Sequence, residues 1–324
     1  MSIEKTIETY KIQMLLYKKL SEEVKYVIDQ KISDKNIKIN NLSCREKSIE
    51  SLTKKIKRKS YKNPLDEITD LAGVRIVSYY EPDIQNIKEI IEENFNVHKR
   101  VDKTKALGVD KMGYHGSHFV VSLGDRYSGT RYDGIINLKC EIQVRTVLQD
   151  AWALISHHLV YKEESSIPDR MKRDLNNVAS LLEISQGIFD SMREKRECYI
   201  YEIHEKEKAP ANFLSQPVDY DTLYAYTKWK YKDLPVSDNW HIRLLSDLNL
   251  QKYPTLEAID NIVERTKEAV TSYQKENPTW FRDGTAYITK SLGFGDEEFC
   301  NKHGFGQKTR EAFLKYKHLV KNTI

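Results

Sequence analysis

The sequence predicts an α+β fold, in which one mixed β-sheet is flanked by helices and is followed by a mainly α-helical second domain. Segments typical of strands and helices follow one another in the order strand, helix, strand, strand, strand, helix over residues 74–160. Residues 211–324 show few strand signals and contain a clear amphipathic helical pattern at 256–273. A chain of 324 residues is long enough for two domains with separate cores.

The first predicted elements are helical and precede the sheet. Apolar residues at helical spacing predict one or two amphipathic helices over residues 3–31, and a basic helix is predicted over 45–59. The β-branched and aromatic run at 74–80 predicts the first strand. Pro82 begins a helix over 84–94, whose isoleucines share one side.

The rest of the first domain supplies the other strands and a closing helix. Strands are predicted at 95–101, 117–123 and 135–145. Residues 124–134 read as a hairpin-like loop between the last two strands. An apolar stripe predicts a helix at 147–160.

A long helical stretch with an apolar seam begins at Pro168, becomes rich in charge over 193–208 and meets Pro210. We place the domain boundary at this proline. The predicted division is a first domain at residues 1–165, a helical connector at 166–210 and a helical domain at 211–324. A regulatory and a structural role for the last domain both stay open.

The composition predicts a soluble protein of the cytoplasm. Hydrophobic residues make up 40% and charged residues 31% of the chain. The mean hydropathy is -0.63, and no long apolar run suggests a transmembrane segment. The first twenty residues mix acidic side chains with lysines and interrupt the apolar pattern, so a secretory signal is not expected.

Charge and cysteine content narrow the expected partners. The four cysteines include no CxxC pair, so neither a zinc site nor a disulfide framework is expected. The net charge of +4 is no strong nucleic-acid signature by itself. The dense basic run at 54–62 nevertheless suits a phosphate-rich substrate.

Polar and aliphatic side chains alternate in Glu-Ile-Gln-Val-Arg-Thr, the end of the last predicted strand. Glu141, Gln143 and Arg145 share one face, because successive side chains of a strand point to opposite faces. A carboxylate, an amide and a guanidinium on one face are typical of an active-site wall. An amphipathic strand on a solvated sheet would give the same pattern.

A basic motif, Arg45-x-Lys47-x3-Ser51-x3-Lys55, falls in the predicted helix over 45–59. On a helix, its last three members lie four residues apart and would stack along one face. Two ammonium groups and a hydroxyl in line suit a polyphosphate chain. A solvated basic helix is the alternative interpretation.

Asp70-Leu-Ala-Gly73-Val-Arg75 leads into the first predicted strand. A carboxylate before a strand could bind Mg²⁺, and Gly73 allows a ligand or neighbouring backbone to come close. A helix or turn cap is the alternative role for Asp70.

A glycine-flanked loop, Gly-Tyr-His-Gly-Ser-His, begins at residue 113. Tyr114 is free to stack on a base beside its glycines. His118 could donate a hydrogen bond to a phosphate or a sugar. With the polar face of the last strand, these groups would surround one end of the sheet.

These motifs and the string EIQVRTVLQDAWALISHHLVYK resemble the synthetase domain of the RelA/SpoT family, the alarmone synthetases of the stringent response. Those enzymes carry an Arg-x-Lys-x3-Ser-x3-Lys helix, an Asp-x-x-Gly-x-Arg strand start and a Gly-Tyr-x-x-x-His loop. Their fourth motif is Glu-(Ile/Val)-Gln-(Ile/Val)-Arg-Thr followed by Trp-Ala, His and Tyr-Lys. The match covers about residues 40–165 in order and spacing, and four ordered motifs are specific where one would be weak.

The resemblance implies a nucleotidyltransferase-like fold and an ATP-dependent pyrophosphokinase. Such an enzyme transfers the β,γ-pyrophosphate of ATP to the 3′-hydroxyl of GTP or GDP and makes (p)ppGpp. Asp70 and Glu141 would hold Mg²⁺, with Glu141 close to the attacking hydroxyl. The residues implied to bind ATP are Arg45 and Arg75, on either side of the adenine, and Lys47, Ser51 and Lys55, on the phosphates. The residues implied to bind the acceptor are Tyr114, His118, Gln143, Arg145 and His157.

Departures from the family pattern touch the acceptor side. Gly116 stands where the family usually has serine, and Ser156 stands where a glutamate commonly precedes the helix histidine. The loop DKTKALGVDKMG is closer to stand-alone or toxin-like members. No His-Asp dipeptide occurs, so we expect synthesis of the product without its hydrolysis.

Two alternatives therefore stay open. One is a toxin-type synthetase that pyrophosphorylates the 3′ end of tRNA, under the control of residues 211–324, to which a protein trigger could bind. The other is a nucleotide-binding module without catalytic activity. The sequence also leaves open whether the chain forms a homo-oligomer.

Overall fold

The computed structural model describes residues 2–102, 116–159 and 168–321. The chain divides into two compact units, Met1–Arg193 and Glu194–Ile324. The division falls inside the long helix α6 (Asp169–Lys206), within the segment that we expected to be a connector and before Pro210.

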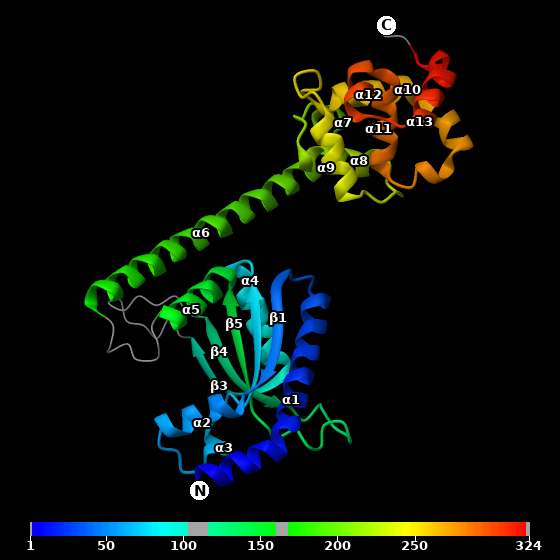
Figure 1. The fold of residues 1–324 in the computed structure, drawn as a ribbon. Coiled ribbons are helices and arrows are strands. Elements are labelled where there is room, and N and C mark those ends of the chain that lie inside the picture. Colours follow the sequence, from blue (N-terminus) through cyan, green and yellow to red (C-terminus); the bar gives the residue numbers. More distant parts are fainter. Residues whose placement is uncertain (1, 103–115, 160–167, 322–324) are drawn as a thin grey trace. The chain divides into compact units, whose positions relative to one another are not determined.

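The first unit is built on one five-stranded sheet with the strand order β1-β2-β5-β4-β3 (Figure 1). Its strands are β1 (Ile39–Glu46), β2 (Ala72–Ser78), β3 (Phe95–Asp102), β4 (Ser117–Leu123) and β5 (Cys140–Thr146). Only the central pair, β2 and β5, is parallel, and the other neighbours are antiparallel. The predicted mixed sheet is confirmed.

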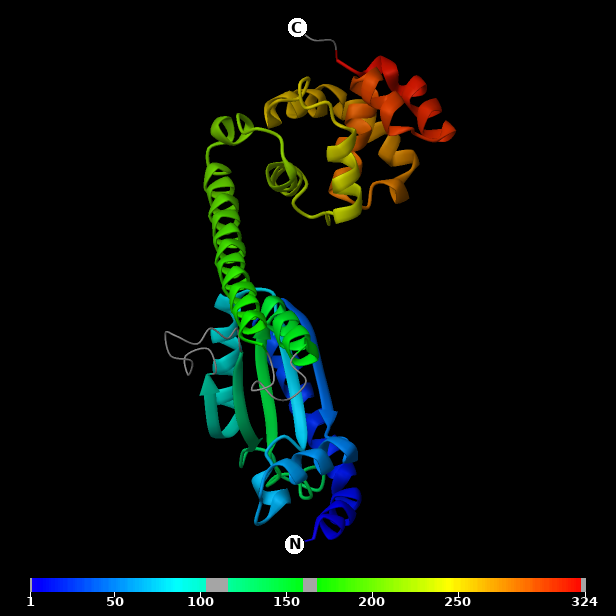
Figure 2. The same cartoon turned by 60° about the vertical axis from the view of Figure 1, so that its left-hand side comes forward.

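Four helices of the first unit contribute apolar side chains to the core on one face of this sheet, namely α1 (Ile3–Asp34), α2 (Ile49–Arg58), α3 (Pro64–Glu67) and α4 (Glu81–Asn94). Helix α5 (Val147–Leu159) follows β5, and its Trp152 packs with Ala179 of α6 in a separate cluster. Aliphatic side chains of β2 and β5 form one core with the apolar stripes of α1 and α4. Figure 2 shows these two helices on the same side of the sheet. In β5, Ile142 and Val144 are buried, while Glu141, Gln143 and Arg145, which alternate with them, are partly exposed. The alternation thus separates a core face from a polar face.

Two predicted segments require correction. Residues 39–46 form strand β1, and α2 begins at Ile49 instead of residue 45. The sequence stretch lacks a clear β pattern, but antiparallel pairing with β2 holds it extended. Ser48 begins the helix because its side chain accepts a hydrogen bond from the backbone N–H of Ser51. Lys47 therefore precedes the helix, and only Ser51 and Lys55 of the basic motif lie on it.

Strand β5 is also shorter than predicted. It begins at Cys140, because residues 135–138 form turns with backbone hydrogen bonds to Tyr132 and Ile135. Ile135 is nevertheless fully buried in the core. The apolar character of Ile135 predicts a strand residue, but its side chain reaches the core from a turn.

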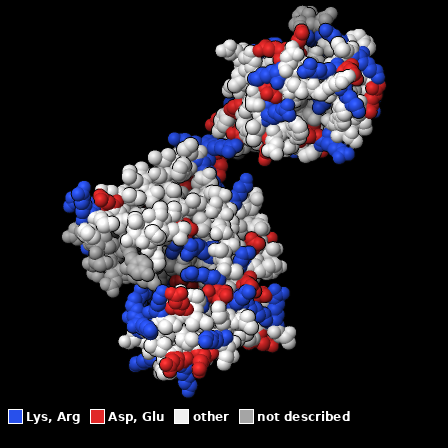
Figure 3. Space-filling view, viewed as in Figure 1, with Lys and Arg blue, Asp and Glu red and all other residues white. Residues whose placement is uncertain are grey.

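The second unit is helical and has its own core. Beyond α6 it contains α7 (Pro210–Leu214), α8 (Tyr220–Lys230), α9 (Asp238–Asp247), α10 (Leu256–Glu276), α11 (Gly284–Gly295), α12 (Glu297–His303), α13 (Gln307–Tyr316) and two short 3₁₀ segments, Pro278–Trp280 and Lys317–Leu319. Tyr226 is fully buried and donates a hydrogen bond to Asp260 at 2.6 Å, so it belongs to the core. Charges of both signs are intermingled on the visible face of this unit (Figure 3).

A search of the described part of the chain finds no helix with the length and apolarity needed to cross a bilayer.

Candidate active site

The polar face of the sheet holds the groups singled out in the sequence. The register pairs Arg45 of β1 with Gly73 of β2, and Gly73 with Glu141 of β5. Two residues further along the same strands, Arg75 pairs with Gln143. Paired positions in neighbouring strands point to the same side. Side chains from three strands therefore converge on one surface.

These residues line a cavity of about 170 Å³. Its lining consists of Ser43, Cys44, Arg45, Asp70, Gly73, Val74, Arg75, Glu141 and Gln143. A Cβ built on Gly73 would meet no atom closer than the Arg45 carbonyl oxygen, at 3.8 Å. The surrounding atoms therefore leave room for a side chain at Gly73. Because Gly73 lines the cavity, any larger residue at this position would occupy part of the cavity.

Asp70 is held by two lysines. Lys47 Nζ donates to Asp70 Oδ2 at 2.7 Å, and Lys55 Nζ lies 2.9 Å from Oδ1. Burial acts to raise the pKa of Asp70, but the two ammonium groups outweigh it and hold this pKa below its ordinary value. The carboxylate is therefore ionised at neutral pH.

The backbone around Lys47 is fixed from two sides. Its N–H donates to the Leu71 carbonyl at 2.9 Å, beside Asp70. Its carbonyl accepts a hydrogen bond from Tyr10 of α1 at 2.6 Å. Lys55 reaches the same carboxylate from α2. Lys47 is thus held between β1 and α2, and Lys55 is held on α2. Together they place two ammonium groups beside Asp70, at the edge of the cavity.

Glu141 is the second carboxylate of the cavity. His118 Nδ1 lies 3.1 Å from Glu141 Oε1, and Gln143 Nε2 donates to Oε2 at 3.0 Å. Burial acts to raise the pKa of Glu141, but the hydrogen bonds with His118 and Gln143 outweigh it and lower this pKa. His118 is itself buried on β4, and its Nε2 has no hydrogen-bond partner among the described residues. Two acceptor-side residues of the prediction thus contact Glu141.

Asp150 is a site residue that the sequence motifs miss. It lies in the first turn of α5, 3.3 Å from Arg75 Nη1 and 3.5 Å from Arg145 Nη1. Burial and, next, the charge of Arg75 lower the pKa of Arg145, and Asp150 opposes both effects. One carboxylate therefore bridges two mutually repelling guanidinium groups. The sequence does contain one indication of this role, because Asp150 follows the polar motif of β5 by only a few residues, in the first turn of α5.

The donor set fits a hard divalent cation. Asp70 and Glu141 are both ionised carboxylates that line one cavity. The negative charge of Asp70 acts to raise the pKa of Glu141, as expected for two neighbouring carboxylates. Asp70 Oδ1 is buried, and the ammonium of Lys55, 2.9 Å away, is the partner that the described residues give it. No group of three or more histidine, cysteine or acidic residues suited to a metal occurs in the described chain. Mg²⁺ is commonly bound by one or two carboxylates together with substrate phosphates, so two suffice.

Two predicted residues stand apart from this cluster. Ser51 is exposed on α2, and its hydroxyl accepts a hydrogen bond from Ser48 at 2.8 Å. His157 is exposed in the last turn of α5. Tyr114 lies outside the described residues. Their roles, like those of the other predicted site residues, stay predictions.

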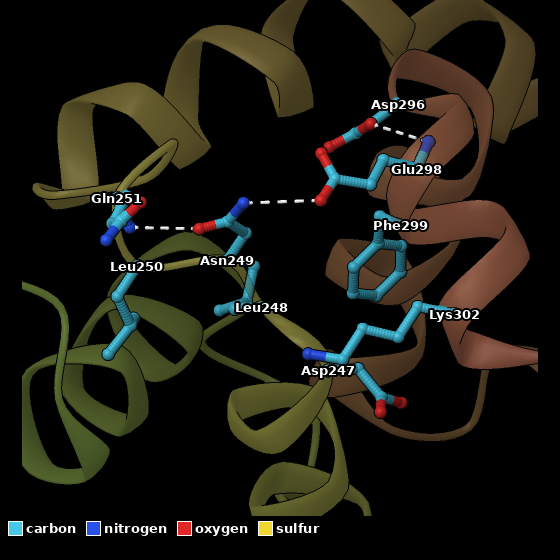
Figure 4. Close-up of a pocket in the computed structure, with 9 residues that line it drawn as sticks. All are labelled: Asp247, Leu248, Asn249, Leu250, Gln251, Asp296, Glu298, Phe299 and Lys302. Carbon is cyan, nitrogen blue, oxygen red and sulfur yellow. Dashed lines mark hydrogen bonds between the residues drawn. The ribbon is translucent and has the colours of Figure 1, made fainter.

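A larger hollow in the second unit offers less chemistry. It has a volume of about 450 Å³ and lies between the α9–α10 connection and α12 (Figure 4). Asp296 at its wall accepts hydrogen bonds from Lys252 at 2.7 Å and Tyr253 at 2.5 Å. Asn249 donates to Glu298 at 3.2 Å. These polar groups hold the connection to α12, so we assign the hollow a structural role.

A cavity on a mixed sheet, with two ionised carboxylates among lysines and arginines, is typical of an enzyme that transfers phosphate groups from a nucleotide. The model of the region found in RelA/SpoT proteins matches residues 44–166. The GTP pyrophosphokinase YjbM of Bacillus subtilis (strain 168) is 32% identical over 169 residues, which are 50% of this chain and 74% of that protein. The chain belongs to the RelA/SpoT family and is a transferase of the pyrophosphokinase type.

Two further relatives agree with this assignment. GTP pyrophosphokinase YwaC of the same organism is 26% identical over 147 residues, 44% of this chain and 68% of that protein. The crystal structure of the small alarmone synthetase 1 from Bacillus subtilis aligns with a TM-score of 0.50 and 25% identity, over 59% of this chain and 98% of that one. The family resemblance read from the motifs is confirmed.

Proposed function

We propose that this protein transfers the β,γ-pyrophosphate of ATP to the 3′-hydroxyl of GTP or GDP, and so makes (p)ppGpp in the cytoplasm. The observation that carries the proposal is the convergence of Asp70 and Glu141 on one cavity. The arginines implied to bind ATP line the same cavity. The names of the two curated relatives, both GTP pyrophosphokinases, support the choice of acceptor.

The cation-rich edge of the cavity suits the ATP phosphates. Lys47 and Lys55 both lie within 3 Å of Asp70. A triphosphate that brings its own negative charge competes with Asp70 for these ammonium groups and frees the carboxylate for a cation. Mg²⁺ held by Asp70 and Glu141 would supply positive charge to the phosphate oxygens when it is bound. Pyrophosphate transfer depends mainly on such charge and on in-line positioning.

Glu141 is placed to orient the acceptor hydroxyl. In the proposed reaction the 3′-oxygen forms a bond to the β-phosphorus of ATP, the bond from that phosphorus to the α–β bridging oxygen breaks, and AMP leaves. Each oxygen of Glu141 has one hydrogen-bond partner among the described residues and retains further acceptor capacity. An ionised carboxylate can accept a hydrogen bond from the hydroxyl and receive its proton. His118 and Gln143 keep Glu141 ionised and in position.

The test is transfer of label from γ-labelled ATP to GTP or GDP by the purified full chain in the presence of Mg²⁺. We expect Asp70→Ala and Glu141→Ala each to lower turnover by at least about 10³-fold, because each removes a charge that acts on the transition state. Asp29→Ala, at an exposed position on α1, is the matched control. Near-normal turnover in either site variant would contradict the proposed roles.

A second acceptor, the 3′ end of tRNA, is favoured by one observation. Lys54, Lys57 and Arg58 of α2 are exposed next to Lys55, which reaches the cavity edge. An exposed basic surface beside the site suits a polyanionic acceptor. Deacylated tRNA offered in place of GTP separates the two candidates, since label moving only to tRNA would establish the second one. ATP binding without transfer to any acceptor would indicate a nucleotide-binding module.

A further inference from the structure

One row of paired residues crosses all five strands on the polar face of the sheet. From β1 to β3, in the order of the strands, its members are Arg45, Gly73, Glu141, Val120 and Lys99. Because paired positions in neighbouring strands point to the same side, Lys99 shares the face of Glu141. Two strand spacings, or about 10 Å, separate the backbones of these two residues.

A β-bulge in β3 turns Lys99 toward this polar face. The pairing of β3 with β4 shifts between Val97 and Lys99, and His98 is the extra residue. Val97 packs against the core, whereas His98 Nε2 lies 2.7 Å from Ser122 Oγ, on the face that Ser122 shares with Val120. With strict alternation, Lys99 would share the core face of Val97. Bulges beside active sites often redirect a side chain in this way.

The ammonium group of Lys99 is free to bind a ligand. Lys99 is exposed, and within residues 2–102, 116–159 and 168–321 it has neither a hydrogen bond nor an ion pair. Its neighbour Arg100 points to the other face, where its guanidinium lies 5.6 Å from the centre of the Phe119 ring and donates to Glu92 of α4 at 2.8 Å. Strand β3 thus presents one cation to each face, and the described residues neutralise only the one on the core side.

Lys99 also lies on the side of Glu141 that is left open by the residues assigned to ATP. Those residues come from β1, β2 and α2, whereas β4 and β3 flank β5 on its other side. In the proposed reaction the acceptor therefore approaches Glu141 over β4. A nucleotide whose 3′-hydroxyl meets Glu141 carries its 5′-phosphate on the far side of the ribose, toward β3.

We propose that Lys99 binds the phosphate on the 5′-carbon of the acceptor ribose and so selects phosphorylated acceptors over nucleosides. The proposal rests on the proposed function, because it takes Glu141 as the group that meets the 3′-hydroxyl. A lysine ammonium binds phosphate oxygens as a compact charge with three donors. A phosphate on this carbon is present in GDP, in GTP and in the terminal nucleotide of tRNA, so both candidate acceptors share the chemistry.

A lysine on an edge strand can also serve another purpose. Strand β3 is the last strand of the sheet, beside β4 (Figure 1), and an edge lysine discourages pairing with another chain. That purpose predicts no dependence on the phosphates of the acceptor. A comparison of phosphorylated with unphosphorylated acceptors therefore separates the two roles.

The first test is calorimetric binding of GDP and of guanosine to the full chain, with the donor site filled by α,β-methylene ATP and Mg²⁺. The methylene bridge of this analogue is not cleaved, so binding is measured without transfer. Lys99→Gln should weaken GDP binding about tenfold and leave guanosine binding unchanged, because only GDP carries the phosphate. Lys99→Arg should retain most of the affinity, because it keeps the charge. Arg100→Gln removes the neighbouring charge from the other face and, as the matched control, should bind both ligands like the wild type.

The second test is transfer of label from γ-labelled ATP. Lys99→Gln should raise the KM for GDP about tenfold and leave the KM for ATP unchanged, a separation that a general loss of folding would not produce. If the wild type binds tRNA in place of GDP, the variant should instead weaken tRNA binding. The slope of the logarithm of that affinity against the logarithm of the salt concentration should then fall by about 1.

The outcomes separate this inference from the proposed function. Wild-type affinity for the phosphorylated acceptor in Lys99→Gln, or an equal loss for GDP and guanosine, would overturn the role of Lys99 and leave the reaction intact. GDP binding that depends on Lys99, without transfer by the wild type to any acceptor, would support Lys99 as a phosphate ligand and overturn the reaction. A wild-type chain that binds neither GDP nor tRNA would overturn both.

Discussion

Substitution of Asp150 by asparagine tests whether the two arginines of the site need their common carboxylate. Asp150 lies 3.3 Å from Arg75 and 3.5 Å from Arg145, and its own side chain is 17% exposed. Asparagine keeps the size of the side chain and removes the charge. The two guanidinium groups then repel each other without the neutralising partner that the structure gives them.

The expected magnitude follows from these contacts. Hydrogen bonds to charged groups contribute about 1.5–3 kcal/mol, and the long distances and partial exposure place each contact at or below the lower end of this range. Since about 1.4 kcal/mol corresponds to a tenfold change, displacement of both arginines should lower kcat/KM by about 10- to 100-fold. We expect the loss to fall on the substrate that Arg75 or Arg145 contacts, which titration of ATP and of the acceptor separately will reveal.

The assay is steady-state pyrophosphate transfer, with the midpoint of thermal unfolding measured beside it. Asp150→Glu should recover part of the activity, because it restores the charge. Asp29→Asn removes an exposed acidic charge elsewhere in the unit and should change neither quantity. If Asp150→Asn keeps kcat/KM within twofold for both substrates, the carboxylate does not position the arginines and the reasoning fails.

Three further predictions concern Gly73 in the cavity, Gly116 just before β4 and two histidines of the second unit. Gly73→Val should leave the unfolding midpoint unchanged, because a Cβ there has room, but should weaken ATP binding in calorimetry at least about tenfold by filling the cavity. Gly116→Ser, the residue usual in the family, should cost about 1–3 kcal/mol in chemical denaturation, because its Cβ would lie 2.2 Å from the Val144 carbonyl oxygen; an unchanged midpoint would contradict this. Burial lowers the pKa of His241 and of His303, so the folded state favours their neutral forms. Their contribution to stability is complete above the unfolded pKa of about 6.5 and is lost as the pH falls below it, which pH-dependent unfolding monitored in the second unit will measure. Substitution of both histidines by glutamine should flatten that dependence between about pH 7 and 5.

The elements predicted well are those whose side chains follow a local period. Strand β4 matches its predicted range of 117–123, and α1 extends as one helix through the predicted 3–31. The segment at 39–46 was missed because no period marks it as a strand, and pairing with β2 alone makes it one. Local spacing also misassigned Lys47 to the helix, since Ser48 ends the extended segment with its capping hydrogen bond.

The sequence by itself determined the family and the polar face of β5, because motif order and the two-residue period of a strand are local properties of the chain. Only the tertiary structure decided how those groups are partnered. The clamp of Lys47 and Lys55 on Asp70 and the bridge of Asp150 between two arginines depend on strand register and helix placement. The same holds for the exposed apolar side chains of α6, such as Leu181 and Ile184, because their exposure follows from the packing of Ala179, on the other side of the helix, against Trp152. Contacts between distant segments arise from long-range packing, which no window of sequence contains.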